Sequence, residues 1–524
     1  MPSPCRSPAW RSAPARRGRF VESGDVLSGV CTGCNVFVDS VGIAALLFAS
    51  PALDMHLDTA VKQHLVGFAV AQGVLAHLAR PGRTTRPVIA PPGYEMVPGL
   101  LCLVSHVAAT ITAGAHTHAE LLSTVLIAVA LVSATSALLL ACASSRPRAL
   151  AQVPESVRVG ILAHVGLHLF ELAVRQATSK GVAELASEGT HLDFALLAPP
   201  LGAALALWLV LRSSTAPLIA TLAVPGILFL VGAHVHLARL AAGLSLAEAQ
   251  EQRWLLPSTE GAPLFSLWQA INPRMARWSL LCTPTCLYYV VSAALLPVLS
   301  SCLNLALLEQ FERPRSVDLR AETRAHGLAS FVAASIGGAP CFFSLSCTAV
   351  HNNLGAVTRA SSWVAVATAL ALATLRGSAE LIGLMPRAII STTCAYIAFD
   401  FVWDGLVSKC AWRADFAWGW LTLALCARLG ALGGGVCAIG AHALLVAVRD
   451  EVALAAVSTL RTPEVTPTRP PRRSASPKQA RTPGRTASGS RPGSLSPAQR
   501  RQLQRTEPSA GRVRERLLRS GSVR

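Results

Sequence analysis

Apolar stretches long enough to lie within a membrane recur along most of the chain, and short polar connections separate them. This pattern predicts an all-α polytopic membrane protein with about 14 transmembrane segments. The expected segments cover residues 26–50, 64–78, 94–113, 121–142, 153–174, 194–211, 216–240, 278–308, 325–336, 341–352, 363–374, 381–402, 416–429 and 434–448.

Two of the expected segments begin after a break in the helical pattern. The third follows the sequence Pro-Pro-Gly at 91–93, and its first turn carries Tyr94 and Glu95. The tenth follows Gly-Gly-Ala-Pro at 337–340 and is expected to begin near Cys341. Glycine and proline both interrupt helices, because the glycine backbone loses more conformational freedom on folding and proline lacks the N–H that a helix needs. Irregular backbone inside a membrane is tolerated only against protein or a watery cavity.

Paired breaks in two halves of a chain indicate a transporter built from inverted repeats, here of seven segments each. The start of the tenth segment offers unpaired N–H groups, the positive end of the helix dipole, and the hydroxyls of Ser344 and Ser346. These features favour an anion site. The alternative is an ordinary loop between two spans, with the serines bonded back to the helix.

A second pair of polar residues lies within the first span. Asn35 and Asp39 are four residues apart and therefore point to one face of the helix. An acidic side chain inside a span is costly and by default marks a functional site. The alternative is a cap near the membrane interface. As a site residue, Asp39 is the candidate for proton coupling.

The composition supports a membrane protein. Of the 524 residues, 52% are hydrophobic and only 14% are charged, against about 25% in soluble proteins. The net charge of +18 is concentrated at the two ends of the chain. Residues 1–20 hold five arginines and no acid, and residues 461–524 hold sixteen Lys or Arg and three acids. The positive-inside rule then places both termini in the cytoplasm and requires an even number of spans.

The two ends of the chain are also rich in Pro, Arg and Ser. We therefore expect a disordered N-terminus over 1–24, a transporter domain over 25–450, and a disordered cytosolic tail over 451–524. The tail would attract anionic lipid headgroups, with Ser474 and Ser476 as sites at which phosphorylation changes the charge. Nucleic-acid binding is the weaker alternative for a tail that is tethered to a membrane protein.

Enzyme motifs are missing from the sequence. It contains no nucleotide-binding glycine loop, no G-x-S-x-G and no H-E-x-x-H, so neither an enzyme nor a cofactor is expected. Histidine pairs occur at 116/118, 164/168 and 234/236, and we expect packing or proton passage there rather than metal binding. The 14 cysteines are scattered, mostly within apolar stretches, and are expected to be small buried residues.

Residues 318–359 read DLRAETRAHGLASFVAASIGGAPCFFSLSCTAVHNNLGAVTR. This stretch resembles the signature of the SulP family of sulfate permeases and related anion transporters. The resemblance is carried by Asp318, Glu322, Gly327, Gly337, Gly338, Pro340, Ser344, Ser346, Gly355 and Arg359. Weaker support comes from Pro154, Val157, Gly160, Ala163, Gly166 and the acidic stretch 400–404, and residues 303–307 are similar to a fungal and bacterial branch of the family.

The resemblance implies two inverted repeats of seven segments, divided into a core domain and a gate domain. It also implies a substrate site between the third and tenth half-helices, facing the first and eighth spans. The candidate substrate-binding residues are Asn35, Asp39, Tyr94, Glu95, Asn304, Cys341, Phe342, Phe343, Ser344 and Ser346.

Three departures from the family pattern qualify these expectations. Cys347 stands where animal members often carry Arg, which weakens the case for sulfate. The eighth span has Ser300, Ser301 and Asn304 where proton-coupled members often carry an acid, which weakens the case for proton coupling. The basic tail stands where a STAS domain usually follows the last span, so the usual support for regulation and for a homodimer is not expected from it.

The sequence therefore favours a secondary transporter of an inorganic or small organic anion, sulfate-like in type, that works by an elevator-like movement of core against gate. The expected partners are a small anion, a proton if transport is coupled, membrane lipid at the basic tail, and a second copy of the chain. One alternative is a transporter of the same fold for another substrate, such as a nucleobase or a dicarboxylate. Another is a membrane scaffold or sensor that transports nothing.

Overall fold

The computed structural model describes residues 22–78, 87–113, 117–145, 153–214, 216–259, 261–311, 317–375, 377–408 and 413–460. The chain forms two compact units, 1–454 and 455–524, and of the second only the helical residues 455–460 are described. The basic tail beyond 460 and its serines, like residues 1–21, lie outside the described residues.

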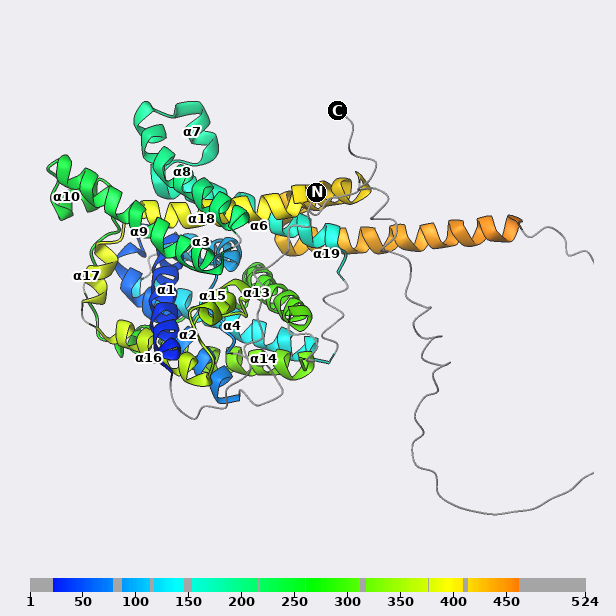
Figure 1. Ribbon diagram of the computed structural model, residues 1–524, viewed down its shortest axis with the longest axis horizontal. Coiled ribbons are helices and arrows are strands. Elements are labelled where there is room, and N and C mark those ends of the chain that lie inside the picture. The colour runs from blue at the N-terminus through cyan, green and yellow to red at the C-terminus, as the bar shows by residue number, and fades with distance from the viewer. Residues whose placement is uncertain are drawn as a thin grey trace, which may run out of the picture. The chain divides into compact units, whose positions relative to one another are not determined.

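Helices make up nearly all of the described chain (Figure 1). The longer ones are α1 (Ser23–Leu47), α2 (Leu57–Leu78), α3 (Val97–Thr112), α4 (His118–Ala143), α6 (Glu155–Thr178), α8 (His191–Ser213), α9 (Pro217–Ala241), α13 (Pro284–Phe311), α14 (Leu319–Ser335), α15 (Leu345–Asn353), α16 (Arg359–Thr374), α18 (Arg387–Val402) and α19 (Arg413–Leu460). Short helices are η1 (Asp54–His56), η2 (Tyr94–Met96), α7 (Val182–Glu188), α10 (Leu246–Glu251), α11 (Ser266–Ala270), α12 (Trp278–Leu281), α17 (Ser378–Gly383) and the π-helix η3 (Trp403–Ser408).

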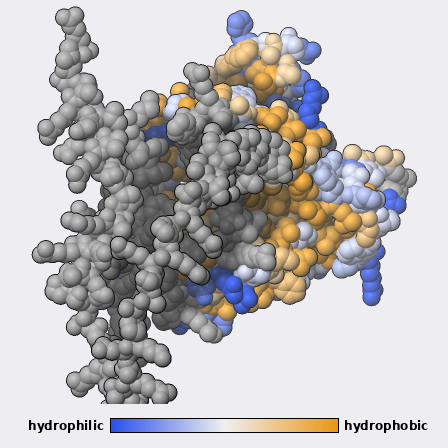
Figure 2. Space-filling view, turned by 90° about the vertical axis from the view of Figure 1, so that its right-hand side faces the viewer, coloured by the Kyte–Doolittle hydropathy of each residue, from blue (hydrophilic) through white to orange (hydrophobic). Residues whose placement is uncertain are grey.

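The protein is an integral, multi-pass membrane protein. Among the described residues, eight helices are long and apolar enough to cross a membrane. Apolar side chains cover much of the surface that Figure 2 leaves visible. Large apolar residues such as Phe229, Leu230 and Leu237 on α9 are exposed, as they would be on a helix that faces lipid. The prediction of 14 segments is not confirmed, because several helices are shorter or more polar than an ordinary span.

Helix α2 begins seven residues before its predicted start at 64. The residues just before that position include polar ones, which in the structure are buried and bonded. Lys62 is 2% exposed and forms an ion pair with Asp58, and its ammonium also donates to the carbonyl of Ala262. Charged groups tolerate burial when they are paired in this way, so the helix continues through them.

Two other expected segments differ from the structure near their ends. The segment expected over 381–402 is divided at Pro386, which lies between α17 and α18. Proline disfavours helical backbone in the residue before it. The last two expected segments fall within α19, whose helical course is interrupted at Gly430 with φ 76° and ψ 166°. Glycine adopts that left-handed φ without a steric penalty, so a kink replaces the expected loop.

The helices of the first unit pack in two groups. The core group contains α1–α4 and α13–α16, and the gate group contains α6, α8, α9 and α18. In Figure 1, α1, α2 and α16 lie side by side, as do α4, α13 and α14. The two groups touch where α3 meets α6 and where α15 meets α9.

The packing pairs reveal two related halves. Exchanging α1–α4 for α13–α16 turns the α1–α16 contact into α13–α4, and the α2–α16 contact into α14–α4. It also turns α3–α13 into α15–α1, and it exchanges α6 with α18, which pack against each other. Each half therefore repeats the same arrangement, with a broken, shorter helix in third place, as the sequence predicted.

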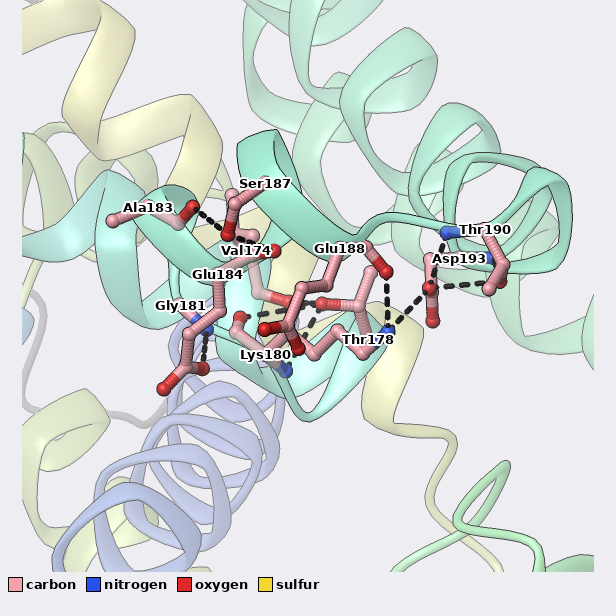
Figure 3. A network of polar contacts seen from close by, with 10 residues as sticks. All are labelled: Val174, Thr178, Lys180, Gly181, Ala183, Glu184, Ser187, Glu188, Thr190 and Asp193. Carbon is pink, nitrogen blue, oxygen red and sulfur yellow. Dashed lines mark hydrogen bonds and ion pairs between the residues drawn. The ribbon is translucent and has the colours of Figure 1, made fainter.

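The connection between α6 and α8 contains the short helix α7 and is held by a network of polar contacts (Figure 3). Lys180 lies at its centre, and its ammonium donates to the carbonyl of Glu188 at 3.0 Å and to the carboxylate of Asp193 at 3.0 Å. The hydroxyl of Thr190 caps α8 by accepting from the Asp193 N–H. These bonds fix the entry of α8 relative to the end of α6, and with it the geometry of the gate group.

A buried carboxylate joins the N-terminal ends of α1 and α16. Asp25, which is 0% exposed, accepts hydrogen bonds from the N–H of Val357 at 2.8 Å, the N–H of Thr358 at 3.0 Å and the Thr358 hydroxyl at 2.7 Å. We expect Asp25→Ala to lower the free energy of unfolding by about 3 kcal/mol, because it leaves three hydrogen-bond donors without their acceptor.

The measurement for this prediction is the melting temperature of the detergent-solubilised protein. Glu188→Gln, at an exposed side chain, is the control and should melt like the wild type. An unchanged melting temperature for Asp25→Ala would show that this carboxylate does not stabilise the core group.

Candidate functional site

The segments that precede the two broken helices lie side by side and are joined by backbone hydrogen bonds. The N–H of Phe342 donates to the carbonyl of Pro91 at 3.2 Å, and the N–H of Ser344 donates to the carbonyl of Ile89 at 3.1 Å. The pairing is antiparallel, since the later residue of one segment meets the earlier residue of the other. Pro91 lacks an N–H and takes part through its carbonyl alone. We call residues 88–93 the first leader and residues 339–344 the second leader.

This pairing corrects the predicted start of the tenth segment. Helix α15 begins at Leu345, four residues later than the expected Cys341, because the second leader stays extended to bond the first. Ser344 is the N-cap, and its hydroxyl accepts from the N–H of Cys347 at 3.3 Å. The prediction of a helix restart with a serine in its first turn is confirmed, but the helix is one turn shorter.

Helices α2 and α13 brace the two leaders. The side-chain amide of Gln72 accepts from the Ala90 N–H at 3.1 Å and donates to the Val88 carbonyl at 2.8 Å. On the second leader, the Phe343 N–H donates to the Ser301 hydroxyl at 3.2 Å, and the Asn304 amide donates to the Phe343 carbonyl at 2.9 Å.

A second glutamine of α2, Gln63, binds the turn before the second leader. Its side-chain amide donates to the Gly337 carbonyl at 2.9 Å and to the Leu126 carbonyl at 2.8 Å, and its backbone carbonyl accepts from the Ala339 N–H at 3.2 Å. Through the bonds of Gln63 and Gln72, both leaders are held at fixed positions along α2.

Helix α2 also approaches the second leader more closely than a side chain would allow. A Cβ added to Gly67 would lie 2.5 Å from the Ala339 carbonyl oxygen, and one added to Gly338 would lie 2.7 Å from the Gly67 Cα. Both glycines are therefore needed for the backbones to meet. The contact places the start of α15 against the core group.

The first turn of α15 keeps free hydrogen-bond donors. Among the residues that the structure describes, the backbone N–H groups of Leu345 and Ser346 have no protein acceptor. The hydroxyl of Ser346 lies 3.1 Å from that of Ser344, and Ser346 is exposed. Free N–H groups, adjacent hydroxyls and the positive end of a helix dipole together suit a small anion.

Three of the predicted site residues lie on two neighbouring elements: Asn35 and Asp39 on α1, and Tyr94 on η2, directly before α3. The Asn35 amide donates to the Asp39 carboxylate at 3.3 Å. The Tyr94 hydroxyl lies directly on Gly42, where an added Cβ would be 2.0 Å away. Tyr94 is buried and is close enough to Asp39 for an electrostatic interaction.

Two carboxyl groups share this region. Glu95 and Asp39 are close enough to interact electrostatically. Both also lie within electrostatic range of Cys347, the residue after Ser346 in α15. The Glu95 carboxylate also lies beside Gly93, against which the ring of Phe342 packs. Neither carboxyl group forms an ion pair with a residue that the structure describes. The free donors of α15 therefore have two acidic neighbours.

The remaining candidates are buried or already bonded within the core group. Phe343 is 0% exposed and packs with Leu305, Leu308 and Leu319. Cys341 and Phe342 are buried as well, and the N–H of Phe342 is already used between the leaders. Asn304 contacts the backbone of Phe343 through its side chain.

Sequence reasoning missed the residues that hold the leaders, namely Gln63, Gln72, Ser301 and Thr348, whose hydroxyl accepts from the Ile89 N–H at 3.0 Å. A signal existed for Gln72, because a glutamine within a predicted span is costly unless it has a partner. The histidines of one predicted pair, His164 and His168, pack edge to face at 4.6 Å. Within the described residues, no three metal-ligating side chains come together as a metal site.

No family model and no curated protein matches the chain. Solved structures do. The transmembrane domain of a cyanobacterial bicarbonate transporter, BicA, matches with a TM-score of 0.53 and 14% identity over 78% of this chain and 96% of that one. SLC26A9 matches with a TM-score of 0.54 and 14% identity, over 82% of this chain and 65% of its own.

The murine Slc26a9 anion transporter in its inward-facing state matches with a TM-score of 0.57 and 15% identity, over 84% of this chain and 70% of that one. At this identity the likeness concerns the fold. It agrees with the two related halves, the broken third helix of each half and the resemblance seen in residues 318–359. The chain therefore has the transmembrane fold of the SulP-type anion transporters.

Proposed function

We propose that the protein is a secondary transporter of a small inorganic or organic anion. The observation that carries the proposal is the first turn of α15, where the N–H groups of Leu345 and Ser346 lack a protein acceptor beside the hydroxyls of Ser344 and Ser346. Solved structures with this fold include proteins described as a bicarbonate transporter and an anion transporter. The core group would carry the site past the gate group in an elevator-like movement, with both termini in the cytoplasm.

The test is uptake of labelled anions into proteoliposomes that hold the purified protein. Sulfate, hydrogen carbonate, chloride and oxalate are offered singly, with the same unlabelled anion inside. Uptake of at least one of them above that of protein-free liposomes is expected. If none of the four is taken up by folded protein, the anion-transport proposal is wrong.

The carboxyl pair favours one second candidate. Asp39 and Glu95 accept hydrogen bonds when ionised, while the first turn of α15 donates them. A neutral substrate with hydrogen-bond donors and acceptors on one edge, such as a nucleobase, would donate to the carboxylates and accept from the N–H groups of α15. Uptake of labelled uracil in place of every anion would support this candidate.

Asp39 is the candidate for proton coupling. If it loads a proton together with the anion, Asp39→Asn should keep exchange of anion for anion but remove the acceleration by an inward proton gradient. If Asp39 only bonds Asn35, at 3.3 Å, the substitution should lower both modes together. Asn35→Ala is the matched control, since it removes the same hydrogen bond and keeps the carboxyl group. Wild-type flux that ignores the proton gradient would eliminate the coupling role.

We assign the basic tail to anionic membrane lipid and not to transport. Its sixteen Lys or Arg against three acids over 461–524 motivate the assignment. Removal of residues 461–524 should leave anion uptake within about twofold of the wild type, because no segment of the helix groups is lost. It should weaken the binding of the detergent-solubilised protein to phosphatidylserine liposomes. Equal liposome binding with and without the tail would contradict the assignment.

A further inference from the structure

The start of α15 is held in place through a chain of hydrogen bonds that begins on α2. Gln72 is 0% exposed, and its amide bonds both the N–H of Ala90 and the carbonyl of Val88. A side-chain amide here replaces a neighbouring strand, since it satisfies one donor and one acceptor of the first leader. The first leader therefore cannot shift along α2 without breaking two buried bonds.

The first leader in turn holds α15. Ile89, between the two residues that Gln72 binds, accepts from the Ser344 N–H at 3.1 Å and donates to the Thr348 hydroxyl at 3.0 Å. Ser344 is the N-cap of α15, and Thr348 lies one turn further on and is 1% exposed. Both ends of the first turn of α15 are thus attached to the backbone of a single residue of the first leader.

We propose that Gln72 is a positioning residue that sets the anion selectivity of the site, by fixing the first turn of α15 at a set separation from the start of α3. The inference rests on the transport function proposed above. The same leader that Gln72 holds runs directly into Tyr94 and Glu95 of η2, which leads into α3. The two half-helix starts therefore cannot separate or approach unless the bonds of the first leader change.

Selectivity by size follows from this arrangement. An anion between the free N–H groups of α15 and the side chains of Tyr94 and Glu95 is matched to the separation of the two helix starts. A fixed separation of the two helix starts favours the binding of anions of one radius. A looser separation admits larger anions and binds smaller ones less tightly. Gln72 touches no part of the free donors, and its effect is exerted entirely through the first leader.

The experiment compares Gln72→Leu and Gln72→Glu with the wild type in proteoliposomes. Glutamate keeps the volume and the acceptor but loses the donor to Val88. The apparent KM is measured for chloride and for the larger oxalate. We expect the ratio of the two KM values to change about fivefold in Gln72→Leu and less in Gln72→Glu. A change of about fivefold corresponds to the net free energy that one hydrogen bond contributes.

Gln176→Leu is the matched control. This buried glutamine lies on α6 in the gate group, and its amide oxygen accepts from Arg387 at 3.4 Å, far from both leaders in sequence. It should lower the melting temperature without changing the KM ratio. A purely structural role for Gln72 predicts the same pattern for Gln72→Leu, and that result would overturn the proposal.

Thr348→Val provides an independent arm, because it removes the other side-chain bond to the first leader with little change in shape. If Gln72 and Thr348 act through the same leader, the double variant should change the KM ratio by less than the product of the single changes. Independent, multiplicative effects would contradict the proposed chain of bonds. If Gln72→Leu does not fold, the same comparison of KM ratios is made with Gln72→Glu, Thr348→Val and their double variant. Absence of uptake of any anion by the wild type would reject the transport function instead.

Discussion

Replacement of Ser346 by tryptophan is expected to abolish anion uptake while the protein stays folded. Ser346 is exposed in the first turn of α15, so a larger side chain meets no packed neighbour, yet it covers the free N–H groups beside it. Ser346→Ala should be milder. It removes one hydroxyl from the anion, which costs roughly 1.5–3 kcal/mol for a hydrogen bond to a charged group. The measurements are uptake, apparent KM and melting temperature.

Two control variants separate binding from folding. Asn353→Trp places the same side chain at the exposed opposite end of α15 and should leave uptake intact. Ser344→Ala removes the N-cap and should cost about 1 kcal/mol of stability in addition to any loss of affinity. Wild-type uptake and KM in both Ser346 variants would show that the anion binds elsewhere.

The second large effect is expected at Gly67. A single added methyl group would lie 2.5 Å from the Ala339 carbonyl oxygen and 2.8 Å from the Ala339 nitrogen, and neither backbone atom can rotate away. Gly67→Ala should therefore push the second leader off α2 and strain the Gln63 bonds as well. We expect a loss of about 3 kcal/mol, the upper end for an overpacked core, and loss of uptake.

Gly73 on the same helix is the matched control. Its added Cβ would be 3.5 Å from the ring of Trp363, an ordinary contact. Gly73→Ala should keep uptake and raise stability by roughly 0.5–1 kcal/mol, because alanine is the better helix former. Equal melting temperatures for the two variants would mean that the second leader yields easily, and the tight contact at Ala339 would lose its assigned role.

Local sequence patterns were enough for much of the fold. Proline and glycine at 91–93 and 337–340 located both breaks, and apolar length located most of the helices. The predicted start of α2 is wrong because the polar residues Asp58, Lys62 and Gln63 lie outside the apolar run, although Asp58 and Lys62 pair at i and i+4 within the helix. The other partners of Lys62 and Gln63, such as Ala262 and Gly337, are about 200 or more residues away, and no local pattern contains them.

The candidate site was predicted in part for the same reason. The N-terminus of a broken helix is a local feature, and the serines at 344 and 346 were found from it. The antiparallel pairing of the leaders is not local, so the helix was predicted one turn too long and Cys341 was assigned to its first turn. The nearness of Asp39 to Glu95 depends on how α1 packs beside the start of α3, which the sequence pattern does not encode.

The pairing of the leaders also has a consequence for biosynthesis. Ile89 and its partner Thr348 are 259 residues apart, so the first leader leaves the ribosome long before anything exists that can bond it. At typical rates of synthesis this interval lasts about 10 to 50 s. Throughout that time the Ile89 N–H and carbonyl need another partner, from water, lipid headgroups or the insertion machinery. Slowing translation between the two repeats should therefore lower the yield of folded protein more than the same delay placed after residue 353.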